Sequence, residues 1–210
     1  LDMSAFYLDV LKDRLYCSRA DDPARRAAQT VLYEVLTTLV RLIAPVLTFT
    51  AEEIWEYIPG TKEESVQLTS WPEANPKYLD KELELRWNSL LTVRAGVAKA
   101  LEEARQSGLI GTSLMAKVDL WFPERLNSTY ELVKEYQEFL PTLFIVSQVS
   151  LHEPGEEPPT EAAEIEGYAG ARCLVGLAPG EKCQRCWMYS EETVDGVCPR
   201  CQEVLAQSEK

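Results

Sequence analysis

The chain has 210 residues, of which 46% are hydrophobic and 26% are charged, and it carries a net charge of −13. These values predict a soluble globular protein with a sizeable core, and they argue against a protein that coats nucleic acid through a general basic field. The single histidine, His152, excludes a multi-histidine metal site, and no run reaches the ~18–20 apolar residues that a membrane span requires.

Apolar residues at helical spacing dominate the first hundred residues. They predict a helix over residues 2–16 and a second helix that begins at Asp22-Pro23, an N-cap followed by proline, and ends at Pro45. The buried face of the second helix is predicted to consist of its large apolar residues: Val31, Leu32, Val35, Leu36, Leu39, Leu42 and Ile43.

Two more helices are expected in this part of the chain. Thr50-Ala51-Glu52-Glu53 has the pattern of a capping box and predicts the start of a third helix that stops near residue 59. Residues 60–79 read as a surface connection, extended over residues 65–68, and a long helix follows from about 80 to 107. Because each helix alone would leave its apolar stripe in water, we expect the four to close a helical bundle over residues 1–108.

The pattern changes after residue 108. Residues 117–122 alternate between polar and apolar side chains, as in a half-buried strand. Asn127-Ser128 predicts the cap of a helix that reaches about residue 139, and the β-branched and apolar residues 143–151 predict a second strand. We therefore expect a small α/β subdomain over residues 109–152.

The next segment is a linker by composition. Residues 153–166 contain six glutamates and three prolines with no lysine or arginine, which favours an extended, self-repelling chain. We expect an acidic linker over residues 153–170 and a zinc-binding C-terminal peptide over residues 171–210, with one more strand at 172–178. The predicted fold class is mainly α, with the small α/β subdomain and a C-terminal four-cysteine zinc knuckle.

The zinc prediction rests on cysteine spacing. Cys183, Cys186, Cys198 and Cys201 form a C-x2-C-x11-C-x2-C pattern, and two such tight turns together supply four thiolates for one tetrahedral zinc ion. Asp195-Gly196 would form the turn between them. Two disulfides or a redox dithiol are the alternatives. Four sulfurs close the coordination sphere, so we expect one structural Zn²⁺ and no catalytic metal.

Side chains near these cysteines are basic and aromatic. Arg185, Trp187 and Arg200 could form a surface that stacks on unpaired bases and holds phosphates. Alternatively, the arginines offset the net charge of −2 that four thiolates leave on a Zn²⁺ ion. Composition does not separate the two interpretations.

A second basic cluster precedes and opens the second helix. It consists of Lys12, Arg14, Arg19, Arg25 and Arg26. Basic residues at a helix N-terminus are unfavourable for the helix dipole, so they do not serve helix stability. The cluster is either a nucleic-acid-facing surface or a solvated face that pairs with neighbouring acids: Asp9, Asp13, Asp21 and Asp22.

The chain resembles the C-terminal portion of bacterial isoleucyl-tRNA synthetases, which are class I aminoacyl-tRNA synthetases. The helical part is shared in outline with related synthetases, whereas the terminal CxRCW with a paired CPRC is more specific to the isoleucine enzyme. The matching segments are FYLDVLKDRLY (6–16), RRAAQTVLYEVL (25–36), LIAPVLTFTAEEIW (42–55), SLMAKVDL (113–120), LFIVSQV (143–149) and GEKCQRCWMYSE (180–191) with CPRCQ (198–202).

The resemblance implies an anticodon-binding module of an enzyme that attaches isoleucine to its tRNA with ATP. It implies that the four cysteines hold zinc, and that the helix around Arg25 and Arg26 and the knuckle residues contact RNA. The family's HIGH and KMSKS signatures are missing and the chain begins at Leu1, so we expect a piece of a longer protein with no catalytic residues of its own. The expected partners are the anticodon stem-loop of isoleucine tRNA and the N-terminal catalytic and editing domains, in a cytoplasmic, monomeric enzyme.

Two other functions remain open at this point. The first is a zinc-stabilised protein-interaction module that does not bind RNA. The second is a zinc hydrolase, which the closed four-sulfur site disfavours.

Overall fold

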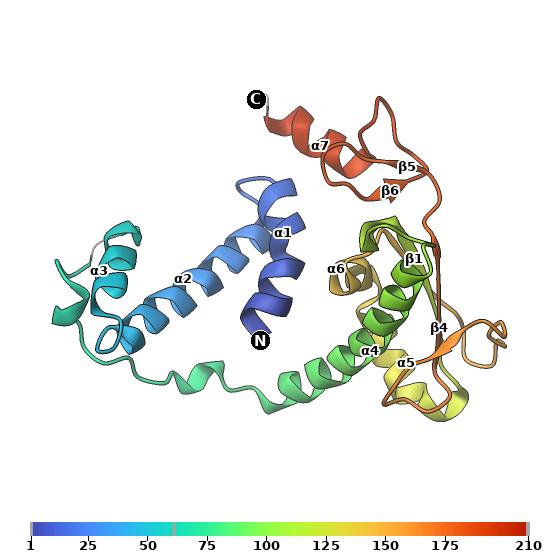
Figure 1. Ribbon diagram of the computed structural model, residues 1–210, viewed down its shortest axis with the longest axis horizontal. Helices are drawn as coiled ribbons and strands as arrows, with labels where there is room; N and C mark the ends of the chain where they lie inside the picture. Colours follow the sequence, from blue (N-terminus) through green and yellow to red (C-terminus); the bar gives the residue numbers. More distant parts are fainter. Residues whose placement is uncertain (1, 61, 209–210) are drawn as a thin grey trace. The chain divides into compact units, whose positions relative to one another are not determined.

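The computed structural model describes residues 2–60 and 62–208 (Figure 1). Its contacts divide the chain into two compact units. One unit is formed by the residues up to Cys17 together with those from Lys81 onward, and the other is Ser18–Asp80. Helices, a small mixed sheet and a cluster of four cysteines make up the chain, as the sequence predicts. The domain boundaries near 108, 152 and 170 stay predictions.

The Ser18–Asp80 unit is helical. It contains α2 (Pro23–Ile43), α3 (Thr48–Tyr57) and two short 3-10 helices, η2 (Val66–Leu68) and η3 (Pro76–Tyr78). The Asp22 carboxylate accepts a hydrogen bond from the backbone N–H of Arg25 at 2.8 Å, which confirms the predicted N-cap. The core of this unit lies where α2 meets α3 and η2, and it consists of Val40, Ala44, Ala51, Trp55, Ile58 and Val66.

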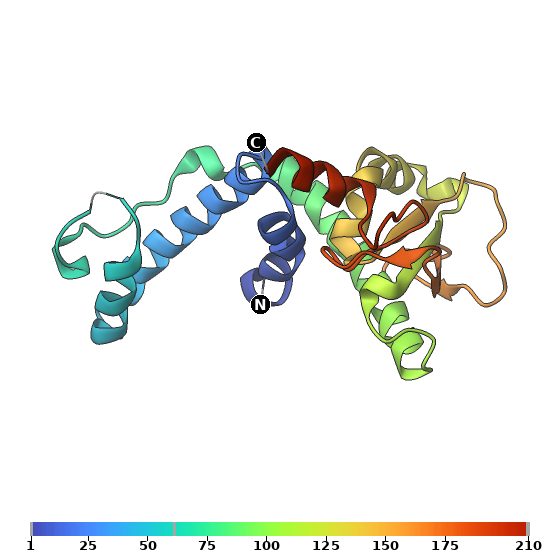
Figure 2. The same cartoon turned by 90° about the horizontal axis from the view of Figure 1, so that it is seen from above.

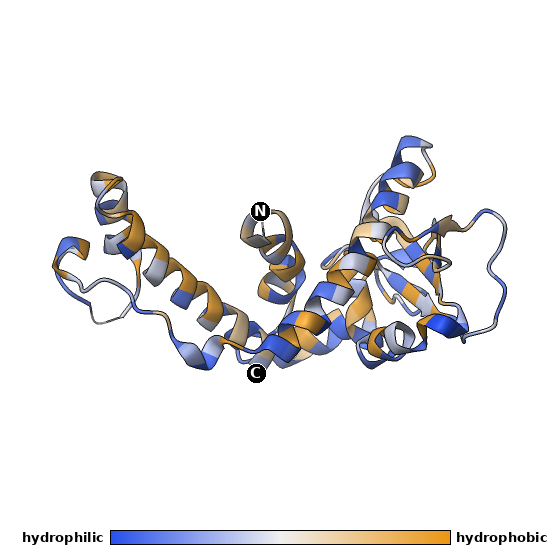
Figure 3. Cartoon of the chain, turned by 90° about the horizontal axis from the view of Figure 1, so that it is seen from below, coloured by the Kyte–Doolittle hydropathy of each residue, from blue (hydrophilic) through white to orange (hydrophobic). Residues whose placement is uncertain are grey.

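The predicted buried face of α2 is wrong for most of its residues. Val31, Val35, Leu36, Leu39 and Leu42 are 37–49% exposed, and Leu32 and Ile43 are only half-buried. The buried positions of α2 are Ala28 and Val40. Within this unit α3 packs on the C-terminal end of α2, so the apolar residues of the preceding turns, which Figure 3 shows along the helix, stay uncovered.

Two local predictions in this unit are also wrong. The third helix begins at Thr48, with Leu47 at its N-cap and no side-chain cap, so the Thr50–Glu53 pattern lies inside the helix. The tight turn after α2 lets the Leu47 carbonyl accept from the N–H of Ala51, which starts the helix early. Residues 66–68 form a 3-10 turn instead of an extended segment, because Ser65 caps it and Val66 is buried in the core.

The second unit begins with a helix, as predicted. A π-helical stretch (η1, Asp2–Tyr7) continues into α1 (Leu8–Cys17), and α4 (Lys81–Gln106) is the predicted long helix. Leu90, Val93 and Val97 bury the inner face of α4. The guanidinium of Arg94, also on α4, lies 4.7 Å from the centre of the Phe6 ring, so α4 and the N-terminal helical segment belong to one packed body.

A four-stranded sheet packs against α4 in the order β2-β1-β4-β3. Strand β1 (Ala116–Trp121) pairs in parallel with β2 (Gln148–Leu151) and antiparallel with β4 (Arg172–Leu177), which also pairs with β3 (Ala163–Glu164). Burial in β1 alternates as predicted from Ala116 to Leu120, but Trp121 and Phe122, at the end of the predicted stretch, are both buried. Helices α4 and α6 lie on one side of the sheet (Figures 1 and 2). A short 3-10 helix, η4 (Ser113–Met115), precedes β1. The crossover from β1 to β2 contains η5 (Glu124–Leu126), α5 (Asn127–Glu135), η6 (Gln137–Phe139) and α6 (Leu140–Phe144).

Two expectations for this crossover need correction. The strand predicted over residues 143–151 is shorter, because residues 140–144 form α6 and the chain turns at Ile145, whose φ is +59°. Apolar residues buried on all sides fit a helix as well as a strand, so composition did not distinguish them. Helix α5 begins at Asn127, but its N-cap is Leu126 and no side chain caps it.

The acidic segment is anchored at its C-terminal end. Ala162 and Ile165 are buried, and Ile165 packs so closely on α4 that a Cβ atom at Gly96 would lie 2.6 Å from its Cγ2 atom. Tyr168 donates a hydrogen bond to the Ser89 carbonyl of the same helix at 3.3 Å. Composition predicted an extended segment throughout, but its few apolar residues find a complementary surface on α4.

The C-terminal region is a small hairpin followed by a helix. Strands β5 (Glu181–Lys182) and β6 (Tyr189–Ser190) pair antiparallel, and α7 (Pro199–Ser208) follows. None of the described helices combines the length and the hydropathy needed to cross a bilayer.

Candidate metal centre and nucleic-acid interface

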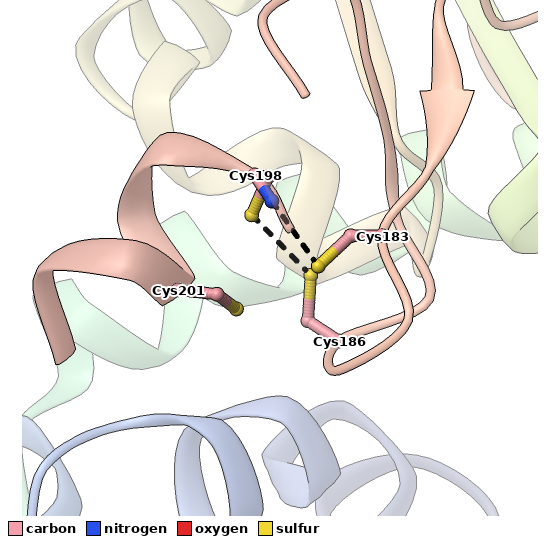
Figure 4. A group of neighbouring side chains, drawn as sticks. All are labelled: Cys183, Cys186, Cys198 and Cys201. Carbon is pink, nitrogen blue, oxygen red and sulfur yellow. Dashed lines mark hydrogen bonds between the residues drawn. The ribbon is translucent and has the colours of Figure 1, made fainter. Parts of the chain in front are cut away.

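The four cysteines of the C-x2-C-x11-C-x2-C pattern converge (Figure 4). Cys183 and Cys186 lie in the connection between β5 and β6, Cys198 directly precedes α7, and Cys201 lies in the first turn of α7. All four Sγ atoms lie within 4.8 Å of one another, and those of Cys186 and Cys198 are 3.7 Å apart. Zn–S bonds of about 2.3 Å in a tetrahedron place sulfurs about 3.8 Å apart, so the geometry fits zinc.

Backbone hydrogen bonds shape the loops that carry these thiols. The carbonyl of Cys183 accepts from Trp187 N–H at 2.9 Å, which closes the first CxxC turn. Val194 and Val197 exchange hydrogen bonds around Asp195 (φ +52°) and Gly196 (φ +77°). Two successive positive φ values are those of a type I′ hairpin turn, so the predicted Asp195-Gly196 turn is confirmed.

The thiols differ in acidity before metal binds. Burial raises the pKa of Cys186 and of Cys198. Burial also acts on Cys183, but hydrogen bonds from the backbone N–H groups of Cys186, Cys198 and Arg185 outweigh it and lower the pKa of Cys183 to about 6. A Zn²⁺ ion would bind all four sulfurs as thiolates, with release of the remaining protons.

The other two cysteines do not belong to the site. Cys173 is buried in β4, and burial raises its pKa to about 11. Cys17, the last residue of α1, packs against the cluster, and burial raises its pKa to about 11 as well. No two cysteines are joined by a disulfide in the described structure, and four sulfurs fill a tetrahedral sphere, which leaves no position for a substrate or a water nucleophile.

The knuckle residues predicted to bind RNA occupy different surroundings. Trp187 is 60% exposed with φ +66°, and the Lys182 ammonium lies 5.3 Å from the centre of its ring. Arg185 donates to the Cys17 carbonyl at 2.6 Å and to the Cys201 sulfur at 3.5 Å. Arg200 donates to both carboxylate oxygens of Asp13, which raises the pKa of Arg200. Trp187 and Lys182 therefore face solvent, whereas the arginines make intramolecular contacts.

The second basic cluster is divided between the two units. On α1, Lys12 pairs with Asp9 at 2.6 Å, and the guanidinium of Arg14 lies 6.0 Å from the centre of the Phe139 ring. In the Ser18–Asp80 unit, Arg19 pairs with Asp21, and Arg25 donates to the Ser18 carbonyl at 2.9 Å.

Arg26 differs from the other exposed members of this cluster, Lys12 and Arg19, which both form ion pairs. It is exposed in the first turn of α2, and its guanidinium has no hydrogen-bond or ion-pair partner among the described residues. Arg14 has no such partner either, but it is half-buried beside the Phe139 ring, so Arg26 is the exposed arginine of the cluster whose N–H donors are all available to a ligand.

One further anchoring residue has no sequence signal. Ser147 is buried, accepts a hydrogen bond from the Tyr189 N–H of β6 at 2.7 Å, and donates to the Leu114 carbonyl at 2.5 Å. This hydroxyl attaches the knuckle to the sheet. No motif marks it, because its partners lie more than thirty residues away on either side.

Comparison with known families identifies the chain. A family model described as the anticodon-binding domain of tRNA ligase matches residues 1–120. The chain belongs to this family. A second family model, described as a zinc finger found in FPG and IleRS, matches residues 180–204 of the same chain. It contains all four converging cysteines, so the predicted cofactor, one structural zinc ion, is confirmed.

Relatives named isoleucine–tRNA ligase extend this result. The present chain is 45% identical to the isoleucine–tRNA ligase of Natranaerobius thermophilus, and the match covers 100% of the present chain. It is 47% identical to the ligase of Moorella thermoacetica over 99% of the present chain, and 50% identical to the ligase of Desulforudis audaxviator over 98%. It spans 22–23% of the length of these relatives. The predicted resemblance to isoleucyl-tRNA synthetases is thereby confirmed.

Proposed function

We propose that this chain holds the anticodon stem-loop of isoleucine tRNA as the C-terminal part of an isoleucine–tRNA ligase. The observation that carries the proposal is the match of residues 1–120 to anticodon-binding domains, joined in one chain to the zinc finger at 180–204. ATP-dependent attachment of isoleucine is assigned to the remainder of such an enzyme, whose catalytic and editing domains are the other proposed partners. The helical-bundle form, a monomeric state and a cytoplasmic location belong to the same proposal.

Two kinds of contact would bind the RNA. Anticodon bases are unpaired, so one can stack on the exposed Trp187 ring beside the Lys182 ammonium. Phosphates of the stem would meet cationic groups, with Arg26 as the leading candidate because its donors are unused. The remaining proposed contacts are Lys12, Arg14, Arg19, Arg25, Arg185 and Arg200, since an ammonium has three N–H donors and a guanidinium five, and one pairing does not exhaust them.

Zinc would support this surface without taking part in chemistry. The segment 180–204 has few large apolar side chains of its own, and its buried cluster consists of the four cysteines, against which Met188 and Val197 pack. Bound zinc would supply the folding free energy, and Cys183 and Cys186 would hold the turn that presents Trp187.

A fluorescence titration tests the proposal. The zinc-loaded chain is mixed with labelled anticodon stem-loops of isoleucine tRNA and of valine tRNA at low and at moderate salt. We expect preferential binding of the isoleucine stem-loop, with an affinity that falls as salt rises. A folded, zinc-loaded chain that binds neither RNA would overturn the proposal in favour of a protein-interaction module.

A further inference from the structure

The zinc knuckle contacts the C-terminal end of α1, although about 170 residues separate them in the chain. Arg200, one residue before the ligand Cys201, donates from Nη1 to Asp13 Oδ2 at 2.5 Å and from Nη2 to Asp13 Oδ1 at 2.7 Å. This two-point geometry adds directional specificity to the ion pair. It fixes the start of α7 against the last turns of α1.

A second arginine connects the metal site to the end of the same helix. Arg185 Nη1 lies 2.6 Å from the carbonyl oxygen of Cys17, the last residue of α1, and 3.5 Å from the Cys201 sulfur. The last carbonyls of a helix lack intrahelical partners, and a cation there is favoured by the helix dipole. One guanidinium therefore touches a zinc ligand and the helix end together.

Both arginines also bear on the charge of the metal site. Four thiolates around one Zn²⁺ give the site a net charge of −2, and Arg185 and Arg200 interact with the sulfurs of Cys201 and Cys186, respectively. Arg200 further contacts the Met188 sulfur, which packs on the cluster, at 3.9 Å. The groups that neutralise the loaded site are thus the groups that hold α1.

We propose that the zinc knuckle is a clasp for the C-terminal end of α1, with Asp13, Arg185 and Arg200 as positioning residues that link zinc occupancy to the docking of this helix. Linkage is reciprocal: zinc binding stabilises the docked end of α1, and the docked helix increases zinc affinity. Since the chain leaves α1 at Cys17, the clasp fixes the point from which the connection to α2 begins.

Variants of the ion pair test the clasp. Asp13→Arg and Arg200→Asp are each expected to lower zinc affinity by roughly three- to tenfold in competition with a chelator, and to speed amide hydrogen exchange over residues 13–17. The double variant Asp13→Arg with Arg200→Asp restores opposite charges and should recover most of both losses. Asp13→Asn and Asp9→Asn form a matched pair, because Asp9 lies on the same helix and pairs with Lys12, and only the former should weaken zinc binding.

Metal depletion of the unmodified chain gives a second, independent readout. We expect faster exchange over residues 13–17 without zinc, while α4 keeps its protection. Unchanged zinc affinity in Asp13→Arg would overturn the clasp. An amide exchange rate in α1 that is the same with and without zinc would also overturn it. A third contrary outcome is a double variant that recovers neither zinc affinity nor protection although each single variant is folded. These measurements use no RNA, so their outcome is separate from that of the proposed function.

Discussion

The zinc knuckle and the start of α2 both carry arginines in an acidic chain, but folding gives those arginines different partners. In the knuckle, Arg200 meets the Asp13 carboxylate and Arg185 meets a helix-end carbonyl and a ligand sulfur. At the start of α2, the Asp22 carboxylate is used to cap the helix, and Arg26 faces solvent. An arginine keeps all of its N–H donors free for RNA only where folding brings no acceptor within its reach, and the neighbouring sequence does not show this.

Removing zinc should have the largest effect, and the effect should fall on the knuckle and not on the start of α2. Structural zinc in small domains contributes roughly 10–16 kcal/mol to folding, so a strong chelator should unfold residues 180–204 and leave α2 and α3 intact. NMR amide shifts would report both regions. Cys201→Ser should reproduce the effect, whereas Cys173→Ser, which changes a cysteine outside the cluster, should retain zinc. If the amide shifts of residues 180–204 stay as widely spread without metal as with it, the knuckle does not need zinc to fold, which would contradict this account.

Lowering the pH should weaken zinc binding by the knuckle, so it should act in the same direction as a chelator. The pKa values of Cys186 and Cys198 are raised by burial, so both carry protons at neutral pH before metal binds. Zinc must displace these protons, and its affinity should therefore fall as pH decreases. Competition with a chelator at about pH 6, 7 and 8 measures the trend. An affinity independent of pH would show that the sulfurs are already ionised.

A substitution outside both regions tests the packing of the segment around Ile165 on α4. Gly96→Ala would place a Cβ atom 2.6 Å from Ile165 Cγ2 in the core, and such overpacking costs about 1–3 kcal/mol. Urea denaturation should show the loss. Gly176→Ala is the control, because a Cβ atom there has no neighbour within 4 Å. Equal stability of the two variants would mean that the segment around Ile165 is not packed as described.

A smaller effect is expected from Arg26→Ala, because it removes one proposed phosphate contact. Affinity for the isoleucine anticodon stem-loop should fall a few-fold, and the slope of log affinity against log salt should decrease by about 1. Arg105→Ala is the matched control, since Arg105 is a partly exposed arginine of α4 that pairs with Glu102. If the two variants bind equally well, Arg26 is not an RNA contact.

The smallest effect should come from Cys17→Ser. Cys17 packs against the metal cluster without being one of the four converging thiols, so the variant should still bind one zinc per chain. Metal analysis after gel filtration measures the stoichiometry. A variant that lost its zinc would make Cys17 a ligand and displace one of the other four.

Features encoded within a few residues could be predicted from the chain. The helices at 8–17, 23–43 and 81–106, the strands at 116–121 and 172–177, the Asp22 cap and the Asp195-Gly196 turn follow from periodicity and turn chemistry. The cysteine spacing predicted the metal site, because two CxxC turns can converge only in a few ways.

Features that depend on distant partners could not be read in this way. Residues 140–144 became helix instead of strand, Ile165 docked on Gly96, and Ser147 tied the knuckle to the sheet. Local propensity gives a segment its conformation, but burial, hydrogen-bond partners and charge pairing arise from surfaces that meet only when the chain has folded. The pairing of Arg200 with Asp13 is of this kind: each residue is ordinary in its own segment, and their joint role exists only in the assembled unit.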